Sequence, residues 1–85
     1  MINKIYKIPK IFFNGLLNTG YTTKDNFNYT KPLNKYYRFH AHIVGDYIEI
    51  HIDGLNNGYY KIVKRPYVLE KEILNIKENN HTIKP

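Results

Sequence analysis

The sequence predicts an α+β domain: a three-stranded antiparallel sheet over residues 36–64, built from two successive hairpins and packed by one C-terminal helix over residues 66–80. Hydrophobic and polar residues alternate over 36–44 and again over 47–53, which is the period of a half-buried strand. A turn sequence, GLNNG, follows the second run. The chain then changes to the spacing of an amphipathic helix.

Length and composition favour one small domain over residues 1–85, with a formal net charge of +6 and no cysteine. The charge is +5 over 1–35, −2 over 36–58 and +3 over 59–85, so attraction to a polyanion is expected. Without cysteine, neither disulfides nor thiolate metal sites are available, which suits a cytoplasmic protein. No apolar run reaches the length of a membrane span, so no membrane partner is expected.

The first third of the chain, residues 1–35, is expected to be an irregular basic segment. KIFFNGLLNTGY is compatible with a short strand or turn near Asn14-Gly15, and TTKDNFNYTKPLNK has the composition of a loop. A loop of that length in a small domain is usually functional, disordered or a misassigned stretch of regular structure. Such a small core would gain from this segment covering a sheet edge, or from a homodimer.

The first hairpin has a register that the sequence itself defines. Gly45-Asp46 between the two alternating runs suits a type II′ turn of two residues. Val44 then faces Tyr47, and one face of the hairpin is apolar. The opposite face collects six polar residues: Arg38, His40, His42, Glu49, His51 and Asp53. A slip of one residue would mix the two sets, so the pattern supports this register.

A third strand is expected over 59–64. We predict a three-residue loop over 56–58, because it places Ile62 on the apolar face and Lys61 opposite Asp53. A two-residue loop would put Ile62 among the charged side chains instead.

The helix over 66–80 is expected to begin at Pro66, since proline is favoured in the first turn. Leu69, Ile73 and Ile76 form a narrow stripe that would pack on the apolar face of the sheet.

Three histidines on the polar face suggest a metal site as one alternative. His40 and His42 are two apart on one strand, and His51 is expected directly opposite His40 and diagonal to His42. Three converging imidazoles can hold zinc and leave a fourth position for water. Glu49 would orient a ligand or act as a base. This local pattern is similar to the strand-borne histidines of carbonic anhydrases. Zinc is therefore the alternative to the expectation of no cofactor.

The same face also permits acid–base chemistry without a metal. His40 and His51 are close enough in the predicted register to share a substrate phosphate, with Glu49 as a further catalytic group. Arg38 or Lys61 would stabilise the phosphate charge. The alternative enzyme is thus a hydrolase or nuclease, with or without metal.

The preferred function is a non-catalytic module that binds nucleic acid through its polar sheet face and basic flanks. A three-stranded sheet backed by a helix can lay its polar face or an edge into a groove. This layout is similar to that of small sheet-reading DNA-binding domains of the AP2 and phage-integrase arm type. Lysines would contact phosphates, and tyrosines would stack on bases. The expected contact set is Arg38, His40, Tyr59, Tyr60, Lys61, Lys64 and Arg65.

Another protein is the alternative partner, for example the target of a phage-type inhibitor. Nine tyrosines and four phenylalanines provide the aromatic anchors that dominate many interfaces, and exposed strand edges accept added strands. In this case the polar face would hold only cross-strand pairs, His42 with Glu49 and Arg38 with Asp53. Each such pair contributes about 0.2–1 kcal/mol.

Overall fold

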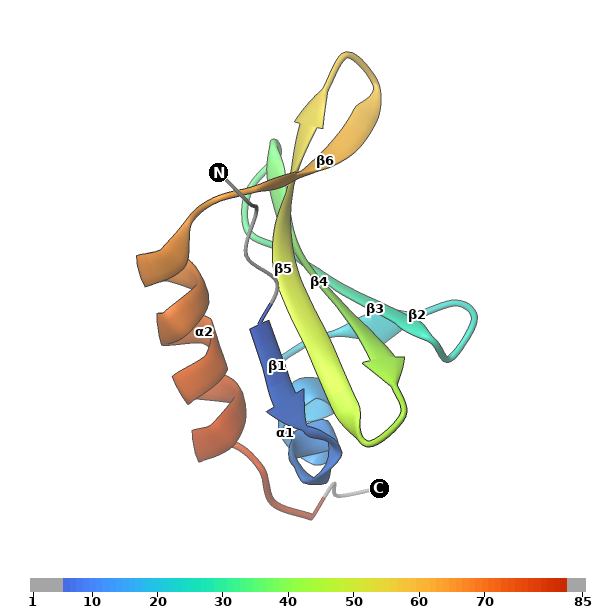
Figure 1. Ribbon diagram of the computed structural model, residues 1–85, viewed down its shortest axis with the longest axis vertical. Coiled ribbons are helices and arrows are strands. Elements are labelled where there is room, and N and C mark those ends of the chain that lie inside the picture. The colour runs from blue at the N-terminus through green and yellow to red at the C-terminus, as the bar shows by residue number, and fades with distance from the viewer. Residues whose placement is uncertain (1–5, 83–85) are drawn as a thin grey trace.

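A computed structural model describes residues 6–82, which form a twisted six-stranded sheet and two α-helices (Figure 1). The elements in chain order are β1 (Tyr6–Pro9), the 3-10 turn η1 (Lys10–Phe12), α1 (Phe13–Asn18), β2 (Thr22–Thr23), β3 (Asn28–Pro32), β4 (Tyr37–Val44), β5 (Tyr47–Asn56), β6 (Tyr59–Val63) and α2 (Pro66–Glu78). The α+β class and the C-terminal helix are confirmed. The prediction of three strands is wrong.

The sheet is antiparallel in every pairing and has the order β1-β5-β4-β3-β2, with β6 also paired to β5. β1 pairs with residues 47–50 of β5, and β6 pairs with residues 52–56. The two short strands therefore follow one another along the same edge of β5. His51 lies at the junction between them.

The β4–β5 hairpin has the predicted register. Val44 pairs with Tyr47, His40 pairs with His51, and Arg38 pairs with Asp53. Gly45 has a φ of +59°, as the first central residue of a type II′ turn requires. The alternation of apolar and polar residues was thus sufficient to place both faces of this hairpin correctly.

The β5–β6 connection corrects the sequence prediction. Its loop has two residues, Asn57 and Gly58, with φ values of +52° and +83°. Asn-Gly is a preferred pair for the type I′ hairpin turn, and this local preference decided the register. Ile62 consequently lies opposite Asp53, and Lys61 pairs with Gly54 rather than with Asp53. The three-residue loop was the wrong choice because one apolar side chain can be accommodated on the polar face.

The N-terminal third is not an irregular segment over its described residues. β1 covers an edge of β5, and β2 and β3 extend the sheet beyond β4. The connection between β2 and β3 is held by Asp25, whose Oδ1 accepts hydrogen bonds from the backbone N–H groups of Phe27 (2.9 Å) and Asn28 (2.8 Å). β1, β2 and β3 are short, and the β2–β3 turn depends on one aspartate. The sequence therefore contains no long alternating run from which these strands could be predicted.

The core lies between one face of the sheet and the two helices. Leu69, Ile73 and Ile76 of α2 are buried, as predicted, together with Ile48 and Ile50 of the sheet. α1 packs closely against the end of α2: a Cβ built on Gly15 would lie 1.9 Å from the carbonyl oxygen of Ile76. No helix in the described part of the chain is long and apolar enough to span a membrane.

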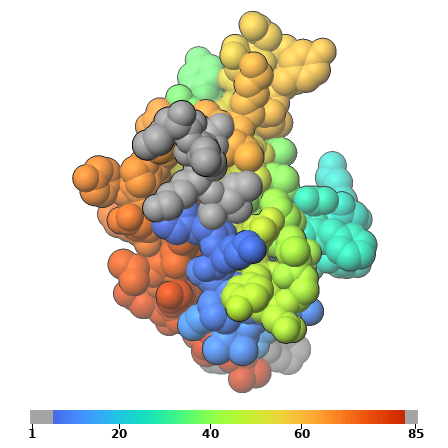
Figure 2. Space-filling view, in the orientation of Figure 1, coloured from blue at the N-terminus to red at the C-terminus, as the bar shows by residue number. Residues whose placement is uncertain are grey.

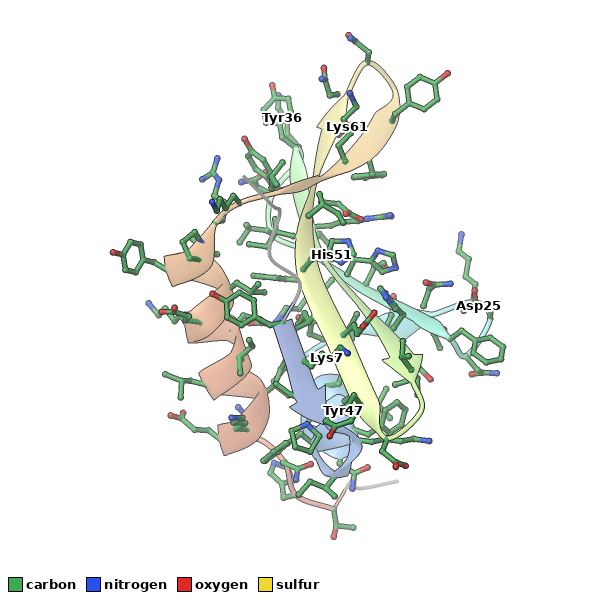
Figure 3. All side chains as sticks on the ribbon, viewed as in Figure 1. Lys7, Asp25, Tyr36, Tyr47, His51 and Lys61 are labelled. Atoms are coloured by element: carbon green, nitrogen blue, oxygen red, sulfur yellow. The ribbon has the colours of Figure 1, made fainter. Side chains whose placement is uncertain are left out.

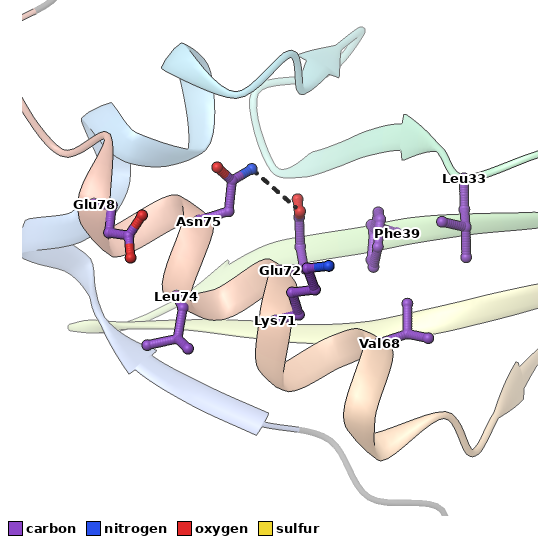
Figure 4. Close-up of a pocket in the computed structure, with 8 residues that line it drawn as sticks. All are labelled: Leu33, Phe39, Val68, Lys71, Glu72, Leu74, Asn75 and Glu78. Atoms are coloured by element: carbon purple, nitrogen blue, oxygen red, sulfur yellow. Dashed lines mark hydrogen bonds between the residues drawn. The ribbon is translucent and has the colours of Figure 1, made fainter.

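A buried carboxylate joins α2 to the sheet at the floor of a groove of about 460 Å³ (Figure 4). Glu72 accepts a hydrogen bond from the hydroxyl of Tyr21 (2.6 Å) and pairs with the ammonium group of Lys31. Burial is the main cause that raises the pKa of Tyr21, so this hydroxyl stays a donor. All three side chains are engaged with one another, and they serve to position α2 on the sheet.

Candidate functional site

Three histidines converge on the face of the sheet opposite the helices. The imidazole centroids of His40 and His51 are 4.8 Å apart, and His42 lies 5.3 Å from His40 and 5.9 Å from His51. One ring nitrogen from each histidine lies within 4.8 Å of one from each of the others. The alternation of β4 and the register with β5 bring them together (Figure 3 labels His51). The predicted convergence is confirmed, and we refer to these three residues as the histidine cluster.

Each ring of the histidine cluster has its Nε2 atom next to an oxygen. Nε2 of His42 lies 3.0 Å from Oε1 of Glu49, and Nε2 of His51 lies 2.6 Å from Oδ1 of Asp53. Nε2 of His40 lies 2.9 Å from Oδ1 of Asn28. Carboxylate and amide oxygens only accept hydrogen bonds, so Nε2 of His42 and of His51 carries the proton, and Nε2 of His40 also faces an acceptor.

Asn28 has its amide orientation fixed by the neighbouring turn. Its Nδ2 donates to Oδ2 of Asp25 (2.8 Å), which leaves Oδ1 facing His40. A chain of hydrogen bonds therefore runs from the β2–β3 turn to the histidine cluster. Asn28 was not predicted as a site residue, because its segment was expected to be a loop and not a strand. The alternation in NYTKP was the only signal available.

Nδ1 is the other ring nitrogen of each histidine in the cluster. The Nδ1 atoms of His42 and His51 are buried and have no hydrogen-bond partner among residues 6–82. Nδ1 of His40 lies 3.2 Å from Oδ2 of Asp53. With the proton on Nε2, this contact brings a nitrogen lone pair against a carboxylate oxygen, which is repulsive unless a proton or another cation is present.

Asp53 is the buried centre of this face. Its Oδ2 accepts from Nε of Arg38 (3.2 Å), while Oδ1 accepts from His51. The guanidinium carbon of Arg38 lies 3.7 Å from the ring centroid of Tyr60, and Ile62 lies opposite Asp53 in the sheet. Tyr60 and Ile62 both belong to β6. They lie near Asp53 because the β5–β6 loop has two residues and not the predicted three, and this register helps to shield the carboxylate from water.

Burial lowers the pKa of His40 below its usual value, although the Asp53 carboxylate acts in the opposite direction. The nearby charges of Arg38 and the other two histidines also favour the neutral ring. A neutral imidazole is the form that binds metal ions.

The accessibility of the cluster falls steeply from β4 to β5. The side chains of His42 and His40 are 27% and 19% exposed, whereas that of His51 is 5% exposed. A substrate would reach the first two and not the third, so the arrangement gives little support to acid–base catalysis by the His40 and His51 pair. Glu49 is engaged by His42 and by Lys7 (Nζ to Oε2, 3.8 Å).

A polar hollow of about 300 Å³ adjoins the cluster on the side of β2 and β3. It shares Asn28 and Arg38 with the contacts described above. The residues lining it are Thr22, Thr23, Lys24, Asp25, Asn28, Thr30 and Arg38. Threonine hydroxyls and the ammonium group of Lys24 suit a small polar ligand or ordered water rather than an apolar one.

A second surface lies at the end of the molecule where the β5–β6 hairpin projects (Figures 1 and 2). The β3–β4 turn ends there too, since the N–H of Leu55 donates to the carbonyl oxygen of Tyr36; Figure 3 shows Tyr36 and Lys61 at this same end of the molecule. We call this surface the basic tip and define it by seven exposed residues: Lys35, Tyr36, Tyr59, Tyr60, Lys61, Lys64 and Arg65.

The basic tip has no acidic residue of its own. The chain has no Asp or Glu over 26–45 or over 54–69. The negative charge of the hairpin lies elsewhere: Asp46 is in the turn at the opposite end of β4 and β5, Glu49 pairs with His42, and Asp53 is buried. The structure thus separates charges that are mixed in the sequence.

The predicted nucleic-acid contact set divides between these two surfaces. Arg38 and His40 belong to the polar face and are engaged by Asp53 and Asn28. The other five members are in the basic tip. Lys35 and Tyr36 complete it and were not predicted, because they lie in the turn between β3 and β4, and neither β3 nor this turn was expected from the sequence.

No protein-family model, curated protein or solved structure matches this chain.

Proposed function

We propose that the protein binds single-stranded nucleic acid through the basic tip. The observation that carries the proposal is the combination, at one end of the molecule, of three exposed tyrosines and four basic side chains with no acidic residue among them. A positive surface attracts the phosphate backbone, and aromatic rings stack on unpaired bases without regard to sequence.

The tyrosines favour single strands over duplexes. Tyr59, Tyr36 and Tyr60 are 73%, 55% and 46% exposed. Arg38 covers one side of Tyr60, and Lys35 lies 5.0 Å from the ring centroid of Tyr36. Tyr59 has no ring or cationic partner among residues 6–82, so its ring is the most available stacking platform. Unpaired bases offer faces for such stacking, whereas duplex bases are already stacked.

In this proposal the polar sheet face contributes less to nucleic-acid binding than was predicted from the sequence. Its cations are paired internally, since Arg38 binds Asp53, and its carboxylates would repel phosphate. Arg38 acts instead as a support for Tyr60, held between that ring and the buried carboxylate.

The test is fluorescence anisotropy of labelled single-stranded and duplex oligonucleotides at several salt concentrations. Single strands should bind more tightly, and the affinity should fall as salt rises. Tyr59→Ala should weaken binding about fivefold or more, given about 1–3 kcal/mol for each stacked base. Lys61→Ala should reduce the slope of log affinity against log salt by about 0.7.

Matched controls lie at the opposite end of the molecule. Tyr47 is 49% exposed, and Lys10 is exposed beside the β4–β5 turn. Tyr47→Ala and Lys10→Ala should leave binding nearly unchanged. Absence of binding at low salt, or equal losses from the control variants, would contradict the proposal. The alternative is that the basic tip binds another protein. In that case labelled oligonucleotides would show no salt-dependent binding to it.

A further inference from the structure

We propose that His40, His42 and His51 form a binding site for a divalent transition-metal ion of the zinc class, with the three Nδ1 atoms as ligands. The site is on the sheet face, separate from the basic tip, and it does not depend on nucleic-acid binding. It rests on three observations: the convergence of the rings, the partners of Nε2, and the absence of partners within residues 6–82 for two buried Nδ1 atoms.

The distances are compatible with such a site after a small adjustment. Zinc–nitrogen bonds of about 2.0–2.1 Å place the ligand nitrogens of a tetrahedral site about 3.3 Å apart. One ring nitrogen of each histidine lies within 4.8 Å of one nitrogen of each of the others, so nitrogens at this spacing need to approach by about 1.5 Å or less, which rotation of a ring can provide. His40 and His42 are partly exposed and can rotate, while the packed ring of His51 provides a fixed reference.

The oxygens around the rings are those that accompany histidine ligands in metal sites. A metal-bound histidine usually donates its other ring N–H to a carboxylate or carbonyl oxygen, which fixes the tautomer and raises ligand basicity. Glu49, Asp53 and Asn28 make these contacts to His42, His51 and His40, respectively. The two carboxylates also offset the charge of a dication bound by three neutral rings.

The unpartnered nitrogens need an explanation that solvent does not supply. A buried polar atom without a partner is destabilising, and such atoms are uncommon in folded proteins. The side chain of His51 is more than nine-tenths buried, yet its Nδ1 has no partner in the described part of the chain. A shared cation would satisfy this atom and Nδ1 of His42, and would relieve the close approach of Nδ1 of His40 to Asp53.

The ligand set selects a chemical class of ion. Imidazole nitrogen suits zinc, copper, nickel and cobalt, whereas magnesium and calcium prefer oxygen ligands. Three protein ligands leave one position of a tetrahedral ion for solvent, as in open rather than closed zinc sites. Access is from the side of His42, the most exposed of the three.

The test is titration of the full chain, freed of metal by a chelator, with Co²⁺ and then with Zn²⁺ as competitor. We expect one Co²⁺ per chain, with the visible absorption of a tetrahedral ion that Zn²⁺ abolishes. His42→Ala should lower the affinity at least tenfold. Glu49→Gln keeps an acceptor but removes the charge, so it should lower the affinity by less than His42→Ala.

The matched control is His81, an exposed histidine outside the cluster. His81→Ala should bind as the unaltered protein does. Equal affinity in His42→Ala, or no stoichiometric binding by the unaltered protein, would overturn the proposal. Should His42→Ala fail to fold, NMR of the unaltered protein decides: Co²⁺ should shift or broaden the ring signals of His40, His42 and His51. Signals affected only at His81 would refute the site.

Discussion

At the scale of single residues, Asp25 shows how one carboxylate organises a hairpin and reaches the candidate metal site. It caps the β2–β3 turn through two backbone N–H groups and holds Asn28, which in turn holds His40. Hydrogen bonds from the backbone and side chain of Asn28 are the main causes that lower the pKa of Asp25. The ionised carboxylate is therefore the form that the folded turn favours.

Stability should consequently depend on pH through this residue. A folded-state pKa below the unfolded value of about 3.9 contributes stability that is complete above that value. The contribution is lost as the pH falls through the folded-state pKa. Asp25→Asn should therefore be less stable than the unaltered protein at neutral pH, and the two should become more alike below about pH 4. Urea unfolding across this pH range measures the difference. A gap that stays constant with pH would show that the charge is not the cause.

Residue-level prediction succeeded where the register was fixed and failed where a strand was missed. The cluster of His40, His42 and His51 followed from the alternation and a two-residue turn, and so did the pairs of Glu49 and Asp53 with their partners on β4. Asn28 could not be found in this way. Its role depends on a cross-strand pairing between short segments that carry little hydrophobic signal of their own.

At the scale of elements, the contact between α1 and α2 has the least room for change. Replacing a glycine within a helix by alanine normally stabilises the helix, since alanine has the higher helix propensity. At Gly15 the added Cβ would lie 1.9 Å from a backbone oxygen of Ile76, and a backbone oxygen cannot turn aside as a flexible side chain can. Steric conflict should therefore outweigh propensity.

Gly15→Ala is expected to destabilise the protein by about 1–3 kcal/mol, the range of overpacked sites. Chemical denaturation provides the measurement. Asn14→Ala is the matched control, because it changes the preceding, exposed residue of the same helix and should alter stability by no more than about 0.5 kcal/mol. Equal stability of Gly15→Ala and the control would mean that the two helices can separate without cost.

The elements differ in how well they can be predicted from the sequence. The β4–β5 hairpin and α2 have long periodic patterns, and both were predicted with bounds close to those observed. α1 has six residues and β2 has two, too few for a period to be recognised. The β5–β6 loop failed for another reason: the local turn preference of Asn57-Gly58 outweighed the sorting of apolar and polar side chains.

At the scale of the whole molecule, the core and the basic tip are separate regions. The molecule measures 38 × 25 × 23 Å, and the β5–β6 hairpin projects from the body formed by the sheet and helices (Figure 2). Residues 55–61 are all exposed. Recognition at the tip can therefore be altered with little effect on folding.

The double variant Tyr59→Ala and Lys61→Ala should change the free energy of unfolding by less than about 0.5 kcal/mol, as is usual for surface substitutions. It should still lose most of the proposed affinity for single strands. Thermal or urea unfolding checks the first expectation independently of the second. A loss of stability above about 1 kcal/mol would show that the hairpin also supports the core.

The short strands at the margins of the sheet have a consequence for self-association. β5 is flanked on one side by β4 and on the other by β1 and β6, which have four and five residues. At the far margin lies β2, with two residues. Fibril growth requires a long, flat edge on which further chains can align. A sheet that tapers to such short strands offers little template of this kind, so contacts between copies would depend on side chains, above all the exposed tyrosines.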